Sequence, residues 1–190
     1  DQFSFRILTG NKEIEIGFPS ASETDFDFVR SLIENDEIPE DVTVSVLTQA
    51  REDLIERTVE SLVGAPRANI HMYNAVAPLF RRVVFNVDRN ECIAIATRGT
   101  ELVMKYAEQM LGDTAFGYQY SPEIFTSAEL DFSLEVCEAV MDVWQPGEGR
   151  EIILNLPATV EMATPNTYAD QIEWFGRNIS RRENVAISLH

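Results

Sequence analysis

The sequence is poor in cysteine and in positive charge. It contains two cysteines, Cys92 and Cys137, and 15 Lys and Arg against 32 Asp and Glu, which gives a formal net charge of −17. Two cysteines without paired spacing exclude a disulfide framework and a cysteine zinc motif, so we expect buried, inert thiols. The shortage of cations argues against a nucleic-acid partner, because such a partner requires clustered Lys and Arg. An anionic substrate would therefore need a locally basic or metal-bearing pocket.

Long apolar runs are also missing. No run reaches the roughly 18 apolar residues that span a bilayer, and no basic and apolar leader opens the chain. These absences predict a cytoplasmic protein that does not bind a membrane. Apolar residues still make up 45% of the 190 residues, which is enough to bury the core of one domain or of part of a larger one.

Strand-like and helix-like segments alternate along nearly the whole chain, which is typical of βαβ units. The predicted strands are residues 13–18, 43–49, 68–73, 116–120, 151–156 and 184–189. The predicted helices are residues 24–35, 52–62, 90–111 and 126–144, and one that begins at Thr164. We expect capping boxes at Asp88 with Glu91 and at Thr126 with Glu129, and residues 1–11 could be the tail of an earlier helix.

Alternation alone fits either a (β/α)8 barrel or a doubly wound open sheet, and the polar residues decide between them. An open sheet concentrates polar groups at one switch point, whereas a barrel gathers them from many strands around a common mouth. Four consecutive strands carry such groups at their carboxyl ends: His71 and Asn74, Ser121 and Glu123, Asn155 and Thr159, and His190. We therefore predict an α/β fold, an incomplete TIM barrel with roughly strands 2 to 7, in which residues 1–190 are part of one catalytic domain.

Most of these polar residues also have an ordinary structural explanation. His71 could be a satisfied core histidine, the Ser121-Pro122-Glu123 turn could cap the next segment, and Thr159 could end its strand. Asn155 is harder to explain in this way, because a buried side-chain amide requires hydrogen-bond partners. No Ser-His-Asp order or Cys-His pairing indicates a covalent nucleophile, so proton transfer beside a metal fits better.

The connection from Asn74 to Arg89 is longer than a usual link between a strand and a helix. It carries two cations, Arg81 and Arg82, in a chain that is otherwise acidic. Long loops on such scaffolds are often functional, which makes this connection a candidate functional segment.

Five segments of the chain resemble the 2-isopropylmalate synthases. They are residues 10–30 (GNKEIEIGFPSASETDFDFVR), 46–58 (VLTQAREDLIERT), 70–75 (IHMYNA), 120–123 (YSPE) and 155–174 (NLPATVEMATPNTYADQIEW). The resemblance covers essentially the whole chain and is closest to the longer bacterial and fungal branch of that family. Homocitrate and citramalate synthases share the barrel and the general chemistry, but the GFPSAS and NLPATVE sequences point away from them.

The resemblance implies an acyltransferase that condenses acetyl-CoA with 2-oxoisovalerate in leucine biosynthesis, and a homodimer. In such enzymes a divalent cation, Mg, Mn or Zn, holds the keto acid and polarises its carbonyl. His190 matches a metal ligand, and Glu123 matches a catalytic carboxylate with an acid–base or water-positioning role. The residues that match the keto-acid pocket are His71, Ser121, Asn155, Pro157 and Thr159.

Several elements of that family have no match in this sequence. They are the first strand with its Asp-x-Arg-Asp-Gly motif, the second metal histidine, the eighth strand and the leucine-sensing regulatory domain. We therefore expect a fragment of a longer enzyme that is inactive by itself. The alternatives are a homocitrate or citramalate synthase, and a non-catalytic barrel fragment that associates with another chain to cover its open sheet edges.

Overall fold

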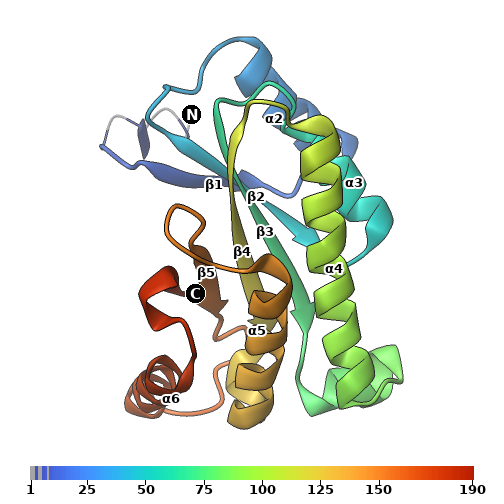
Figure 1. Ribbon diagram of the computed structural model, residues 1–190, viewed down its shortest axis with the longest axis vertical. Coiled ribbons are helices and arrows are strands. Elements are labelled where there is room, and N and C mark those ends of the chain that lie inside the picture. Colours follow the sequence, from blue (N-terminus) through green and yellow to red (C-terminus); the bar gives the residue numbers. More distant parts are fainter. Residues whose placement is uncertain (1–2, 4–5, 8) are drawn as a thin grey trace. The chain divides into compact units, whose positions relative to one another are not determined.

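The computed structural model describes residues 3, 6–7 and 9–190. Helices and strands alternate along these residues, and six strands form one sheet in the order β1-β2-β3-β4-β5-β6 (Figure 1). The pairs β1 with β2 and β5 with β6 are parallel. Because the strand order follows the sequence without a reversal over the described residues, the topology is that of a (β/α)8 barrel and not of a doubly wound sheet. The predicted α/β class, an incomplete TIM barrel, is confirmed.

The observed elements agree with the six predicted strands and five predicted helices. The strands are β1 (Glu13–Gly17), β2 (Thr43–Gln49), β3 (Arg67–Ala75), β4 (Ala115–Glu123), β5 (Ile152–Leu156) and β6 (Val185–Leu189). The helices are α2 (Glu23–Glu34), α3 (Glu52–Ser61), α4 (Arg89–Met110), α5 (Leu130–Trp144) and α6 (Pro165–Asn178), with the π-helix η1 (Phe80–Phe85) and the 3-10 turns η2 (Phe125–Ser127) and η3 (Arg182–Asn184). The expected helical tail over residues 1–11 falls partly outside the described residues. None of the helices in the described part of the chain is long and apolar enough to cross a membrane.

The chain divides into two compact units. Unit 1 holds Asp1–Met72 and Leu102–Tyr118, and unit 2 holds Tyr73–Glu101 and Gln119–His190. Three elements, β3, α4 and β4, therefore contribute residues to both units. The assignment of the whole chain to one catalytic domain stays a prediction.

In unit 1, helices α2 and α3 pack on each other and on strands β1 and β2. Helix α2 buries Phe26, Val29 and Leu32 at helical spacing, and α3 buries Ile55 and Val59 in the same way. This spacing places the apolar side chains of each helix on one stripe, which faces the sheet. The hydrophobic periodicity in the sequence is thus the cause of this layer.

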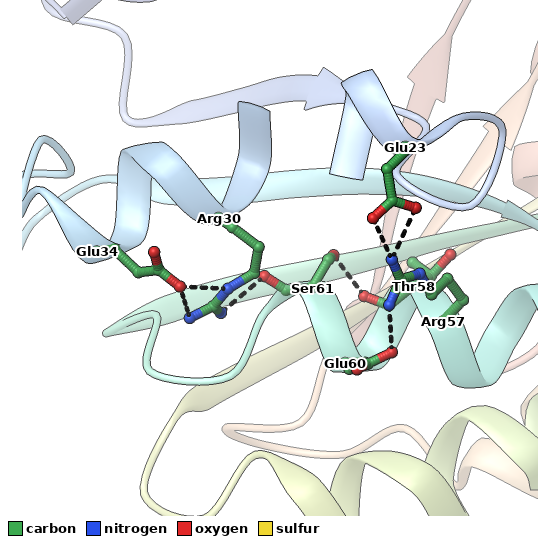
Figure 2. Close-up of polar contacts among 7 residues, drawn as sticks. All are labelled: Glu23, Arg30, Glu34, Arg57, Thr58, Glu60 and Ser61. Atoms are coloured by element: carbon green, nitrogen blue, oxygen red, sulfur yellow. Dashed lines mark hydrogen bonds and ion pairs between the residues drawn. The ribbon is translucent and has the colours of Figure 1, made fainter. Parts of the chain in front are cut away.

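The polar outer faces of α2 and α3 are joined by arginines, as Figure 2 shows. Arg57 on α3 donates to both carboxylate oxygens of Glu23 at 3.2 Å, and its guanidinium lies 3.3 Å from the ring centroid of Phe26. Arg30 on α2 donates to the carbonyl oxygen of Ser61 at 3.2 Å. These contacts fix the two helices against each other, although exposed ion pairs of this kind contribute little stability singly.

In unit 2, helix α5 packs against β5 and α6. It buries Phe132, Val136, Cys137 and Trp144. Cys137 and Cys92 are both free and buried, and burial raises the pKa of each thiol. The expectation of buried thiols is confirmed, and a raised pKa keeps a thiol in its unreactive protonated form.

One predicted capping box is confirmed and the other is wrong. At the start of α4 the backbone N–H of Asp88 donates to Glu91 at 2.8 Å, and the N–H of Glu91 donates back to Asp88 at 2.8 Å. Helix α5 begins only at Leu130, because Thr126 lies in the 3-10 turn η2. Its hydroxyl donates to the carbonyl oxygen of Val160 at 2.6 Å, a distant partner that the local sequence pattern does not reveal.

Candidate functional site

In unit 1, the predicted pocket residue His71 is held by a carboxylate. The His71 side chain is 7% exposed, and its Nδ1 lies 2.6 Å from Oε2 of Glu15 on β1. Since an ionised carboxylate only accepts hydrogen bonds, the proton of this bond sits on Nδ1 of His71. Burial raises the pKa of Glu13, the negative charge of Glu15 raises it further, and His71 lowers it. These three residues therefore form one electrostatically coupled group.

The same face of the sheet is polar in the interior of the strands as well as at their ends. Ser45 on β2 stands in register with Glu15, and Asn69 on β3 donates from Nδ2 to Oγ of Ser45 at 3.1 Å. The sequence analysis missed these residues because it considered only strand ends. The signal was present, since EIEIG and TVSVLT alternate between polar and apolar residues, which is typical of a strand with one polar face.

In unit 2, Asn155 and Ser121 lie side by side near the carboxyl ends of β5 and β4. Nδ2 of Asn155 donates to Oγ of Ser121 at 2.8 Å, and both side chains are buried. The expectation that the buried amide has a partner is confirmed. An amide beside a hydroxyl can orient a bound carboxylate or carbonyl without adding charge.

Glu123 is the last residue of β4, and its backbone is held from two sides. Its carbonyl oxygen accepts from the N–H of Val76 at 3.1 Å, and the N–H of the next residue, Ile124, donates to Oγ1 of Thr159 at 3.2 Å. Burial raises the pKa of the Glu123 carboxyl. A half-buried carboxyl with a raised pKa is suited to proton transfer near neutral pH.

The loop after β5 reaches the end of β6. The N–H of Ala158 donates to the carbonyl oxygen of His190 at 2.6 Å, Pro157 is buried, and the His190 side chain is exposed. The structure thus brings together, at neighbouring strand ends of unit 2, Ser121, Glu123, Asn155, Pro157, Thr159 and His190. His71 belongs to unit 1 and is described with its own neighbours. The functional roles of all seven residues stay predictions.

The donor set of this chain does not complete a metal site. Among the described residues, no three His, Cys, Asp or Glu side chains gather where they could hold a metal ion. Catalytic zinc, for comparison, usually takes three protein ligands and one water. His190 remains a predicted single ligand, and no step proposed below passes through a metal.

The surface of unit 1 also carries an open groove of about 570 Å³ between α2 and α3, whose lining includes Phe26, Arg30, Glu34 and Glu60. Helix side chains form this groove, whereas the predicted functional residues stand on strands and on the loops that follow them. Arg30 and Glu34 already pair with each other at 3.0 Å. The groove therefore offers none of the predicted chemistry.

Unit 2 contains a second charged group, close to the strand ends. Arg81 pairs with both carboxylate oxygens of Glu129, at 2.7 and 3.0 Å, and Arg89 adds a contact to Glu129 at 3.2 Å. Hydrogen bonding from Arg81 is the main cause that lowers the pKa of Glu129 to about 2. A two-pronged arginine–carboxylate pair is among the stronger ionic contacts in proteins.

The lowered pKa of Glu129 predicts how stability depends on pH. The folded pKa lies below the ordinary value of 4.5, so the stability that the pair contributes is present above 4.5 and is lost as pH falls towards 2. We expect Glu129→Gln to lower the free energy of unfolding of the full-length protein at pH 7, and the difference from the native protein to shrink as the pH falls below 4.5. Urea unfolding between pH 7 and pH 3 measures this. A difference that stays constant would contradict the assignment.

Comparison with known proteins fits the fold and these strand-end residues. Residues 8–190 match the HMGL-like family, and the chain belongs to that family. It is 68% identical over 99% of its length to 2-isopropylmalate synthase of Thermobifida fusca, and 66% identical over 99% to that of Streptosporangium roseum. It is 60% identical over 97% of its length to 2-isopropylmalate synthase of Pseudomonas syringae pv. syringae. The chain spans about a third of the length of these curated relatives, namely 33%, 32% and 33%. The predicted resemblance is confirmed.

Proposed function

We propose that the protein to which this chain belongs condenses acetyl-CoA with 2-oxoisovalerate and water, giving 2-isopropylmalate and CoA in leucine biosynthesis. The observation that carries the proposal is the identity of 60–68% to proteins named 2-isopropylmalate synthase. The aligned region includes every residue predicted to handle the substrates. Because the chain spans about a third of those relatives, the activity is proposed for the longer protein.

Two groups of residues in unit 2 have distinct tasks in this proposal. Asn155 and Ser121 donate hydrogen bonds to the keto acid and orient it, which is the usual task of a few fixed polar groups in a binding pocket. Glu123 handles the proton that leaves the acetyl methyl group, either directly or through a water molecule that it positions. Its raised pKa makes it a stronger base than an ordinary carboxylate once it is ionised.

A divalent cation is part of the proposal, with His190 as one ligand and further ligands from residues outside this chain. When bound, such an ion supplies Lewis-acid polarisation of the keto group. Magnesium, manganese and zinc are the candidates. Removing metal with a chelator should abolish activity of the full-length protein, and adding back each ion in turn identifies which one restores it.

The test is substrate selectivity of the purified full-length protein. Thiol release from acetyl-CoA is followed with 2-oxoisovalerate, pyruvate or 2-oxoglutarate as the acceptor. We expect kcat/KM for 2-oxoisovalerate to exceed the other two by at least about tenfold, since pocket shape discriminates side chains on this scale. A preference for pyruvate or 2-oxoglutarate would replace the proposal by a citramalate or homocitrate synthase.

A further inference from the structure

The long connection after β3 folds around a buried arginine. Its central part is the π-helix η1, and Arg81 within it is 7% exposed, although the neighbouring Arg82 is exposed. π-Helices are rare and often occur at functional sites. A buried guanidinium needs compensating partners, because removing a charge from water is costly.

The partners of Arg81 fix its orientation completely. Nη1 donates to the carbonyl oxygen of Val76 at 2.8 Å, and the guanidinium pairs with Glu129 in the two-pronged manner described above. Its flat face lies over the ring of Phe132, 4.4 Å from the centroid. Helix α5, which carries Phe132, and the residue before its start therefore hold Arg81, and Arg81 in turn holds Val76.

Val76 links this group to Glu123. The carbonyl of Val76 accepts from Arg81, while its N–H donates to the carbonyl oxygen of Glu123 at 3.1 Å. The following residue, Ile124, has φ 61° and ψ 39°, a left-handed conformation that is an outlier for a β-branched residue. Such a conformation persists only where the surroundings impose it. The backbone at Glu123 therefore depends on the contacts that restrain it, and the Val76 N–H is one of them.

We propose that Arg81 is a positioning residue for Glu123 and acts through Val76. The inference rests on the proposed function, because that function assigns proton transfer to Glu123. Glu129 and Phe132 fix the guanidinium, the guanidinium fixes the Val76 peptide, and that peptide fixes the carbonyl of Glu123. A displacement of about 1 Å at a reacting group can cost on the order of a hundredfold in rate.

Arg89 provides a matched control. It also pairs with Glu129, at 3.2 Å, and its guanidinium lies 4.9 Å from the centroid of the same Phe132 ring. Its ionic partners within the described part of the chain are Glu129 and Asp131, so it shares the setting of Arg81 without the bond to Val76. The two arginines therefore separate a general contribution to charge and packing from the specific link to Glu123.

The first measurement is steady-state kinetics of the full-length protein with Arg81→Met and Arg89→Met. We expect Arg81→Met to lower kcat by about 10- to 100-fold, with KM for 2-oxoisovalerate within about threefold of the native value. Arg89→Met should leave both constants within about threefold. Arg81→Lys keeps the charge but not the planar fork, so its kcat should fall between those of the native protein and Arg81→Met. Equal effects of the two methionine variants would overturn the proposal.

The second measurement, amide hydrogen exchange followed by mass spectrometry, does not depend on activity. Arg81→Met should speed exchange in peptides that contain the Val76 amide, while Arg89→Met should leave it unchanged. If the native protein makes no 2-isopropylmalate, the proposed function fails and the exchange comparison alone decides the link to Glu123. If the native protein is active and Arg81→Met exchanges like Arg89→Met, the positioning role is overturned. Should Arg81→Met not fold, Arg81→Lys against Arg89→Lys gives the same comparison.

Discussion

Glu123→Gln is expected to lower kcat of the full-length protein by about 10²- to 10⁴-fold, the range that a positioned acid or base contributes. KM for the keto acid should change little, because glutamine has almost the same shape and keeps hydrogen-bonding capacity. What it loses is the ability to accept and return a proton. The measurement is thiol release from acetyl-CoA at saturating 2-oxoisovalerate.

The same substitution should make the protein more stable near neutral pH. Burial raises the pKa of Glu123 in the folded state, so the fold favours the protonated carboxyl. The stability that this group contributes is fully present below its unfolded pKa and is lost as pH rises through the folded pKa. Glutamine removes that loss. Thermal unfolding should therefore show a higher Tm for Glu123→Gln at pH 7, and no gain near pH 4.

The control is Glu135→Gln, since Glu135 lies exposed on α5. It removes one carboxylate without touching the strand ends, and both kcat and Tm should stay at native values. A Glu123→Gln variant that retained more than about a tenth of the native kcat would contradict the proton-transfer role. Lower stability of that variant at pH 7 would contradict the account of the raised pKa.

Phe132→Ala is expected to lower the free energy of unfolding by about 3–5 kcal/mol, the usual cost of deleting a buried aromatic ring. The ring is 0% exposed and lies beneath the guanidinium groups of Arg81 and Arg89. Its removal leaves a cavity in the core of unit 2 and takes away the surface on which both arginines rest. Urea unfolding of the full-length protein at pH 7 measures the change.

Phe28→Ala is the matched control for this prediction. Phe28 is 39% exposed on α2, so its removal should cost within about 1 kcal/mol. Phe132→Ala should in addition lower kcat in the manner of Arg81→Met, because it loosens the same guanidinium. A loss of stability no larger than that of Phe28→Ala would show that the Phe132 ring is not a core contact.

The fold was predictable because it depends on local patterns. Apolar residues at helical spacing and short branched runs gave all six strands and five helices, and the strand-end polar residues favoured the barrel. The errors lie where distant partners decide. Strand β4 continues past Tyr120 to Glu123, and Thr126 fails to cap α5 because its hydroxyl bonds to Val160, 34 residues away.

The candidate site was predictable only in part. Asn155 was recognisable because a buried amide needs a partner, and the structure supplies Ser121. Glu15 was missed because its contact with His71 joins residues 56 positions apart. Arg81 and Arg82 were noted together, but nothing in the two adjacent residues shows which guanidinium turns inward. That choice is made by Glu129, Phe132 and the carbonyl of Val76, all brought close by folding.

The bond between Glu15 and His71 also has an evolutionary consequence. Each side chain meets part of the other's hydrogen-bonding need in a place where His71 has little access to water. A lineage that replaces the imbalanced partner, whether acid or imidazole, gains little by keeping the other unchanged. Across divergent members of the family, these two alignment columns should therefore change together, even though a whole strand, a helix and two loops separate them.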